Sequence, residues 1–298
     1  MSRTAGRWLR VAGGAAILAA LLWQVGAGPF VDGLRTVDAR ALAVALAIGA
    51  ITTACCAWRW TLVAHGHGIH VPFRAAAPAY YRSQFLNATL PGGVLGDVER
   101  AVRHGRAVAA IGRSTRAVVW ERTAGQGVQL ALAVGVLLLA PSVLRPHVPV
   151  PARGLAVGAA VVLALAVCAA ATRTRAARAA AVVALTSTVA VGGHVAVFLV
   201  AARTAGSQAP VSQLLPLALV VLVAMGIPLN VAGWGPREGV AAWAFAAAGL
   251  GAAQGISTAV VYGVMALVAS LPGLLVLLVD GLRGRAAALP SLPEAVHG

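Results

Sequence analysis

Glu121 and Arg122 stand side by side at the start of an apolar segment, where ionisable side chains are costly to place in hydrocarbon. Adjacent residues on a helix point about 100° apart, so we expect each of the two to have its own partner. Glu121, Gly125 and Gln129 follow one another at four-residue steps and therefore share a helical face. Small and polar faces usually look into a helix bundle. The pattern predicts either a substrate path or a buried ion pair with another arginine.

A cluster of helix-breaking residues interrupts the sequence shortly before that segment. Pro91 lacks an amide donor, and Gly92, Gly93 and Gly96 allow backbone conformations that other residues resist. Asp97 follows, where a carboxylate complements the N-terminal dipole of the next helix. It is either a helix N-cap or a site residue. Freed backbone groups at membrane depth need protein or water partners, so the break predicts a cavity.

A second break of the same kind lies in the other half of the chain. Its helix-breaking residues are Pro228, Gly233, Gly235 and Pro236. Proline is well suited to the first turn of a helix, so we expect a helix to begin at Pro236. Arg237 and Glu238 would then lie at its N-terminus, where an anion such as a phosphate can bind. Bidentate pairing by Arg237 would strengthen that site, which we expect on the outer side of a membrane.

The composition restricts the chain to one class of protein. Of its 298 residues, 60% are hydrophobic and 10% charged, and the mean hydropathy is +0.86. Soluble domains carry about 25% charged residues, so we expect a single integral membrane domain over residues 1–298. The net charge of +15 comes from arginines, without any lysine. These arginines cluster between apolar segments, which favours a membrane topology and anionic lipid headgroups as partners over nucleic acid.

The apolar segments predict an all-α polytopic membrane protein, since one span needs about 20 residues. Six full spans are expected at 8–26, 39–63, 117–140, 154–172, 179–202 and 253–280. Two broken or re-entrant helix pairs are expected at 73–110 and 211–250. A secretory signal at the N-terminus is the alternative to a retained first span, but no small-x-small cleavage site precedes a polar domain.

The positions of the arginines predict the orientation. With both termini in the cytoplasm of a cell with an inner membrane, most arginines fall on the cytoplasmic side. This distribution of arginines requires each broken helix pair to enter the membrane and return to the side from which it came. The first pair would enter from the cytoplasm and the second from outside. That outline is an inverted repeat, in which matched interruptions point to a transporter's binding site. Arg100, Arg103 and Arg106 share a face approximately, and form either a solvated surface or a headgroup-attracting patch.

Cofactor and metal signatures are missing. His65, His67 and His70 do not complete a four-ligand zinc pattern, and three cysteines without CxxC spacing give neither a disulfide framework nor a metal site. No Walker A motif and no hydrolase motif occurs. We therefore expect no metal, no cofactor and no enzymatic activity.

Several motifs resemble those of one family, the lysylphosphatidylglycerol synthase transmembrane or flippase-like family. They are NATLPGGVLGD at 87–97 followed by Arg100, Val-x-x-Glu-Arg ending at 122, IPLNVAGWGPREG at 227–239 and LPG at 271–273. The resemblance implies a polytopic inner-membrane protein that moves a phospholipid or a lipid-linked sugar. Some members carry a soluble aminoacyl-transferase domain. The 298 residues contain none, so we expect a stand-alone member that does not make the aminoacyl lipid.

The sequence leaves three candidate functions for the protein. The first is a flippase or scramblase-like transporter of an anionic or aminoacylated phospholipid, or of a polyprenyl-phosphate sugar. Its headgroup path would be lined by Asn87, Asp97, Arg100, Glu121, Arg122, Arg237 and Glu238. The second is a non-transporting membrane partner of a glycosyltransferase or lipid synthase. The third, an intramembrane enzyme, requires a nucleophile or metal beside Glu121, and the sequence shows none.

Overall fold

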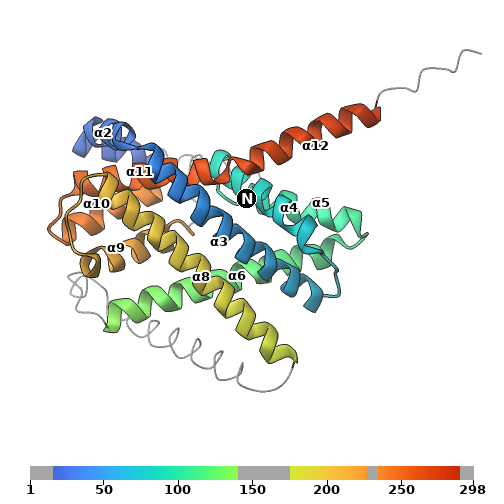
Figure 1. Ribbon diagram of the computed structural model, residues 1–298. Helices are drawn as coiled ribbons and strands as arrows, with labels where there is room; N and C mark the ends of the chain where they lie inside the picture. The colour runs from blue at the N-terminus through green and yellow to red at the C-terminus, as the bar shows by residue number, and fades with distance from the viewer. Residues whose placement is uncertain (1–15, 140–174, 227–233, 289–298) are drawn as a thin grey trace, which may run out of the picture.

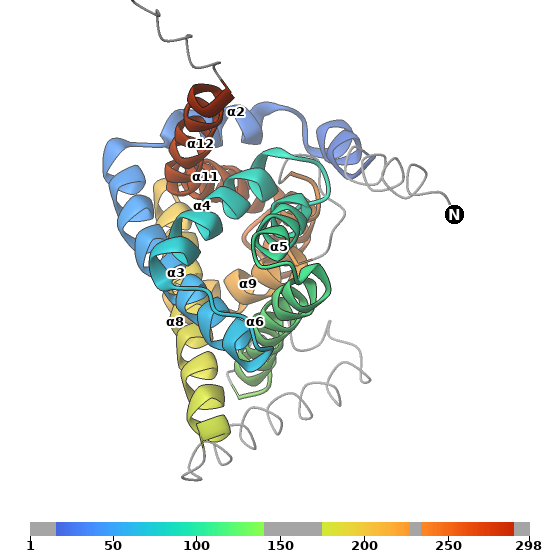
Figure 2. The same ribbon diagram turned by 90° about the vertical axis from the view of Figure 1, so that its right-hand side faces the viewer.

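The computed structural model describes residues 16–139, 175–226 and 234–288, and the regular structure in these ranges is helical. The prediction of an all-α protein is confirmed for this part of the chain. After a first helix, Ala16–Val25, the order is α2 (Gly28–Thr36), α3 (Ala39–Gly66), α4 (Phe73–Thr89), α5 (Leu95–Ala107), α6 (Ile111–Leu139), α8 (Arg175–Thr204), α9 (Val211–Ala224), α10 (Pro236–Ala247), α11 (Ala252–Ser270) and α12 (Pro272–Ala288). The long helices α3 and α8 lie side by side, and α4, α6, α9 and α11 pack against one or both of them (Figures 1 and 2).

Among the described residues, three helical stretches are long and apolar enough to cross a membrane. They are Ala39–Gly66, Ala177–Thr204 and Ala252–Leu282. They confirm the predicted spans at 39–63, 179–202 and 253–280. The third stretch continues from α11 into α12 past Pro272, a residue that fits the first turn of a helix. The full set of six spans is not found among the described residues.

The predicted first span, 8–26, is not a single straight helix. Its described part, Ala16–Val25, bends by 97° into α2, and the two together could form a fourth span. Gly26 adopts a positive φ of 84° at the bend, which favours glycine, and Pro29 suits the first turn of α2. Residues 8–15 lie outside the described ranges. Helix α2 then packs on α11, where a Cβ at Gly33 would lie 2.9 Å from the carbonyl oxygen of Ser257.

Two other predicted spans have different outcomes. Residues 117–139 belong to α6, a continuous helix that is not among the stretches apolar enough to cross a membrane. The first half of α6 carries Arg113, Arg116, Glu121 and Arg122, and these charges lower its hydropathy. The predicted span at 154–172 lies outside the described residues.

The first predicted helix break is confirmed. Helix α4 ends at Thr89 and α5 begins at Leu95. Gly92 and Gly93 between them have φ angles of 92° and 62°, a region that costs energy for residues with a Cβ. Gly96 has a different role, because a Cβ there would lie 2.0 Å from the carbonyl oxygen of Ser83. Its missing side chain lets α5 fold back closely against α4.

The second predicted break is also present. Helix α9 ends at Ala224, and α10 begins at Pro236 as expected. Gly235 precedes it with a φ of 121°, and its amide donates to the Glu238 carboxylate over 2.7 Å. This contact satisfies one of the unpaired donors at the helix start. Pro228 and Gly233, the other predicted break residues, lie outside the described ranges.

The order and packing of the helices repeat along the chain. Each half has a long helix (α3 or α8), two short helices on either side of a break (α4 and α5, or α9 and α10), and another long helix (α6 or α11). The neighbours of the long helices correspond too. Helix α3 packs on α6 of its own half and on α11 of the other half, and α8 packs on α11 of its own half and on α6 of the other. Helices α4 and α9 both have an N-cap proline, Pro72 or Pro210, and a second proline six residues later. These features support a repeat; its inversion across the membrane stays a prediction.

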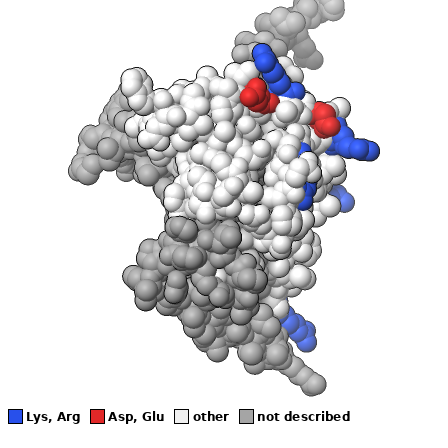
Figure 3. All heavy atoms as spheres, turned by 90° about the vertical axis from the view of Figure 1, so that its left-hand side faces the viewer, with Lys and Arg blue, Asp and Glu red and all other residues white. Residues whose placement is uncertain are grey.

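The outer surface is apolar over wide areas. Figure 3 shows a face on which nearly all described side chains are uncharged, with the few charged ones toward one side. Large apolar side chains are exposed on several helices, for example Leu34, Leu185, Trp243 and Leu275. Such extended apolar surface marks an interaction site rather than a face in water, and it agrees with a protein surrounded by lipid.

Candidate functional site

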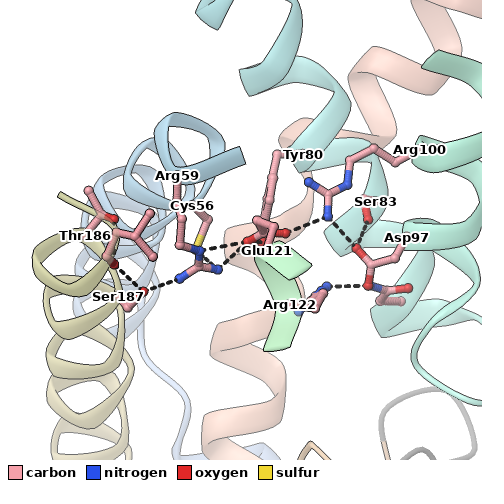
Figure 4. A network of polar contacts seen from close by, with 12 residues as sticks. Cys56, Arg59, Tyr80, Ser83, Asp97, Arg100, Glu121, Arg122, Thr186 and Ser187 are labelled. Atoms are coloured by element: carbon pink, nitrogen blue, oxygen red, sulfur yellow. Dashed lines mark hydrogen bonds and ion pairs between the residues drawn. The ribbon is translucent and has the colours of Figure 1, made fainter. Parts of the chain in front are cut away.

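Glu121 lies at the centre of a buried polar network (Figure 4), whose hydrogen bonds join α3, α4, α5, α6 and α8. One carboxylate oxygen accepts from Arg59 Nε at 2.9 Å, from Arg59 Nη2 and from the Tyr80 hydroxyl at 3.1 Å. The other accepts from Arg100 Nη2 at 3.0 Å. Arg59 also donates to the Ser187 hydroxyl on α8 at 3.0 Å. The prediction of a buried ion pair with another arginine is confirmed, with Arg59 and Arg100 as partners.

Arg100 is fully buried, so it does not belong to an exposed patch with Arg103 and Arg106. Its guanidinium carbon lies 4.6 Å from the ring centre of Trp60 and 4.3 Å from that of Tyr80. Cation–π contacts of this kind gain strength when they are desolvated. Both the headgroup-patch and the solvated-face hypotheses are therefore wrong for Arg100. They fail because the start of α5 packs into the bundle.

Asp97 lies in the first turn of α5 and is not the N-cap, which is Val94. One carboxylate oxygen accepts from the Ser83 hydroxyl at 2.9 Å and from Arg100 Nη2 at 3.0 Å. The other accepts from the Asn87 amide at 3.0 Å and pairs with Arg122 Nη2 at 2.6 Å. The N-cap hypothesis is thus wrong. Asp97 instead holds Arg122, which confirms that Glu121 and Arg122 have separate partners.

The network carries an excess of positive charge. It contains the guanidinium groups of Arg59, Arg100 and Arg122 but only the carboxylates of Asp97 and Glu121. Charges removed from water are costly unless they are paired. Arg122 is the outermost of these arginines, with 37% of its side chain exposed, and its buried Nε has no hydrogen-bond partner among the described residues. Arg100 Nε and Nη1 are likewise buried without a hydrogen-bond partner among the described residues. Of the three arginines, Arg122 is the one that lines the large cavity described below.

A second arginine–carboxylate pair lies in the other half of the chain. Arg237 donates to the Glu238 carboxylate through Nε at 2.8 Å and Nη2 at 2.5 Å. Its guanidinium carbon lies 5.2 Å from the ring centre of Trp234 and 5.9 Å from that of Tyr262. A Cβ at Gly263 would lie 2.2 Å from Arg237 Nη2. The side chain therefore occupies space that only a glycine on α11 leaves free.

One cavity brings the two halves together. It has a volume of about 310 Å³, and both Arg122 and Arg237 line it. The other polar side chains in its wall are Thr52, Thr53, Gln84, Asn87, His194, Tyr262 and Ser270. No described Asp or Glu lines it. Since the predicted break residues Gly93 and Pro236 also line it, the cavity lies where both helix pairs are interrupted.

The predicted site residues divide into two groups. Asn87, Arg122 and Arg237 line the cavity. Asp97, Arg100, Glu121 and Glu238 do not line it; they are buried behind the wall and contact it through the arginines or through Asn87. Of the predicted stripe, Gly125 and Gln129 line a smaller cavity of about 100 Å³, and Glu121 does not. This cavity shares Arg122, Gln84 and His194 with the larger one.

Arg59 is the main site residue that the sequence prediction did not include. The signal was present, because an arginine in the apolar stretch 39–63 is an ionisable residue within a span. Arg82 was also omitted; it is buried and pairs with Glu99 and Asp280, each at 3.0 Å. Arg103 joins Asp280 at 2.9 Å. Counted over the side chains that the structure describes, this second network has two arginines and two carboxylates, so it adds no surplus charge.

Comparison with known proteins identifies the family. The profile described as lysylphosphatidylglycerol synthase TM region matches residues 7–182. The chain belongs to this family. The part that matches the family profile contains the whole Glu121 network except Ser187, whereas Arg237 and Glu238 lie beyond it. The recognition made from the motifs is confirmed. No curated protein matches the chain.

Proposed function

We propose that the protein is a flippase or scramblase-like transporter that moves a phospholipid or a lipid-linked sugar across the cell's inner membrane. The observation that supports this most strongly is the cavity with Arg122 and Arg237 in its wall and no described carboxylate. A cavity with a few polar side chains between interrupted helices is the arrangement that transporters use for their binding sites. The phosphate of the headgroup would bind here while the acyl chains stay in lipid.

The proposed roles of the residues follow from their positions. Arg122 and Arg237 contact the phosphate, each held by its own carboxylate, Asp97 or Glu238. Asn87 binds the Asp97 carboxylate and accepts from the Gly96 amide at 2.8 Å, so it fixes the break next to the cavity. Glu121 and Arg100 act as positioning residues that set the arrangement of α3 to α6. The proposed function involves no covalent chemistry, and the arginine distribution supports a cytoplasmic position for both termini.

Transport of labelled lipids in proteoliposomes tests the proposal. Arg122→Gln and Arg237→Gln remove one positive charge each from the cavity wall, and each is expected to slow transport at least about tenfold, which corresponds to about 1.4 kcal/mol. Arg103→Gln removes the same charge at a half-exposed position in the balanced network and is the matched control. It is expected to retain the wild-type rate.

The outcomes separate the candidate functions. Equal rates for all variants would remove the cavity arginines from the mechanism. If folded wild-type protein moves no lipid of any class, the transporter proposal fails, and the alternative of a partner for a glycosyltransferase or lipid synthase is favoured. Size-exclusion profiles of each purified variant establish that the protein is folded.

A further inference from the structure

We infer that the cavity selects lipids with an anionic phosphate and an uncharged, hydroxyl-rich headgroup, and that it disfavours aminoacylated lipids. This inference rests on the proposed function and narrows its substrate class. It is notable because the family's description refers to lysylphosphatidylglycerol, whose lysyl group adds ammonium charge to the headgroup. The reasons lie in the charge of the cavity wall, in its aromatic residues and in its uncharged polar groups.

The charge of the wall opposes an ammonium group. Arg122 and Arg237 are positive, His194 is neutral or positive, and no described lining residue is acidic. The residues outside the described ranges contain a single acidic residue, Glu294. An ammonium group in this cavity would face like charges, and like-charge juxtaposition costs several kcal/mol at an interface.

The nearby carboxylates are buried, do not line the cavity and already have partners. Both oxygens of Asp97 are used, by Ser83 and Arg100 on one side and by Asn87 and Arg122 on the other. Both oxygens of Glu238 are used as well, by Arg237 and by the Gly235 amide. A cationic headgroup at Asp97 would compete with Arg122, and one at Glu238 would compete with Arg237. Displacement of either arginine would leave that arginine without its carboxylate.

Aromatic residues do not provide a cation site either. Quaternary and primary ammonium groups can bind over aromatic rings, and Trp234 and Tyr262 both line the cavity. Both rings already carry the Arg237 guanidinium, at 5.2 and 5.9 Å from their centres. A ligand cation near these rings would therefore lie close to Arg237 and be repelled by it.

The remaining polar groups of the wall fit hydroxyl groups. Gln84 accepts from the Thr53 hydroxyl at 2.9 Å through its carbonyl oxygen, and its amide nitrogen makes no hydrogen bond to a described residue. Thr52 and Ser270 donate to backbone carbonyls, at 3.1 and 2.7 Å, so their oxygens can still accept. Donors and acceptors of this kind suit the hydroxyls of a glycerol or sugar. About 310 Å³ is at the lower end of ligand-pocket volumes, enough for a headgroup.

Competing lipids in proteoliposomes test the inference. The probes are acyl-labelled phosphatidylglycerol, lysylphosphatidylglycerol and a polyprenyl-phosphate sugar, together with radiolabelled sn-glycerol 3-phosphate as the free headgroup. Phosphatidylglycerol is expected to move at least about tenfold faster than its lysyl derivative, a difference of about 1.4 kcal/mol. The free headgroup is expected to compete for the site without accumulating in the vesicles.

A single substitution adds a matched test of the charge argument. Gln84→Glu keeps the acceptor for Thr53 and places a carboxylate in the cavity wall. It is expected to reduce the preference for phosphatidylglycerol over the lysyl lipid by at least about tenfold. Gln24→Glu makes the same chemical change at an exposed position on the first helix and should leave the preference unchanged.

The outcomes distinguish the inference from the function beneath it. Equal or faster movement of the lysyl lipid by the wild type overturns the inference while transport itself stands. Loss of all lipid movement in folded wild-type protein overturns the proposed function, and the inference with it. Accumulation of glycerol phosphate without lipid movement would reassign the site to a soluble phosphoester and overturn the lipid cargo.

Discussion

At the scale of single residues, the site depends on buried charges that neutralise one another on different helices. Glu121 is fully buried and accepts from Arg59, Tyr80 and Arg100, which come from α3, α4 and α5. Such a group is costly to place in a bundle unless each lone pair finds a donor. The contacts of Glu121 therefore indicate a structural requirement, and under the proposed function its effect on transport would be indirect.

The first prediction concerns this carboxylate. Glu121→Gln leaves Arg59 and Arg100 facing an uncharged amide, and the expected loss is about 3–5 kcal/mol of folding stability. Thermal unfolding in detergent measures it. Arg103→Gln, which alters a pair with a half-exposed arginine, is expected to cost about 0–1 kcal/mol. Similar unfolding midpoints for both variants would show that Glu121 is not a structural centre.

The second prediction uses a glycine to move a guanidinium without changing any charge. Gly263→Ala would place a Cβ 2.2 Å from Arg237 Nη2, which is closer than two such atoms can approach. Arg237 must shift, and lipid transport is expected to fall about tenfold or more. Gly192→Ala is the control, since a Cβ there meets no atom within 4 Å. An unchanged transport rate in Gly263→Ala would argue that the position of Arg237 does not matter.

At the scale of the elements, each broken pair places a carboxylate in the first turn of its second helix. Asp97 has this position in α5 and Glu238 in α10. A carboxylate there is favoured by the helix dipole, and in both cases it also holds an arginine of the cavity wall. Each break thus has two effects. It interrupts the helix next to the cavity, and it begins a new helix whose first-turn carboxylate binds an arginine of the cavity wall.

The third prediction separates the two contacts of Glu238. Glu238→Gln keeps an oxygen that can accept from the Gly235 amide but loses the charge that pairs with Arg237. Glu238→Ala loses both contacts. Because helix-capping contacts contribute about 0.5–2 kcal/mol, the alanine variant is expected to unfold at a lower temperature than the glutamine variant. Equal unfolding midpoints would show that capping at α10 adds nothing measurable.

At the scale of the whole molecule, two similar halves meet along α3 and α8, and the cavity lies between them. The arginines that line it come from helices that do not correspond in the two halves: Arg122 from α6 and Arg237 from α10. Transporters built from repeats expose a central site by moving one half against the other. Under the proposed function, the contact between α3 and α8 is where such motion would be constrained.

The fourth prediction locks this contact. A Cβ at Gly193 would lie 3.9 Å from the Cβ of Thr52, within the range found in disulfides. In a variant with Cys55, Cys56 and Cys168 replaced by serine, Thr52→Cys with Gly193→Cys is expected to form a disulfide on oxidation. Oxidation should reduce transport, and reduction should restore it. Full transport by the oxidised double variant would exclude relative movement of α3 and α8 at this point.

Local features of the fold were predictable from the sequence because a few neighbouring residues determine them. Pro91 with Gly92 and Gly93 ends a helix wherever it occurs, and Pro236 starts one. The apolar stretches that form α3, α8 and α11 were recognised from length and composition alone. The four-residue spacing of Glu121 and Gly125 also predicted that both residues share a helical face directed into the bundle.

The partners of the charged residues were decided only by the tertiary structure. Arg59 and Glu121 are 62 residues apart, and no local pattern specifies which of many arginines meets a given carboxylate. Arg100, expected at a surface or a headgroup, is buried because Trp60 and Tyr80 from other helices enclose it. Arg237 reaches the same cavity as Arg122 because Gly263 leaves room for it. The sequence thus determined where the helices break, whereas the packing of the two halves determined which charges face the cavity.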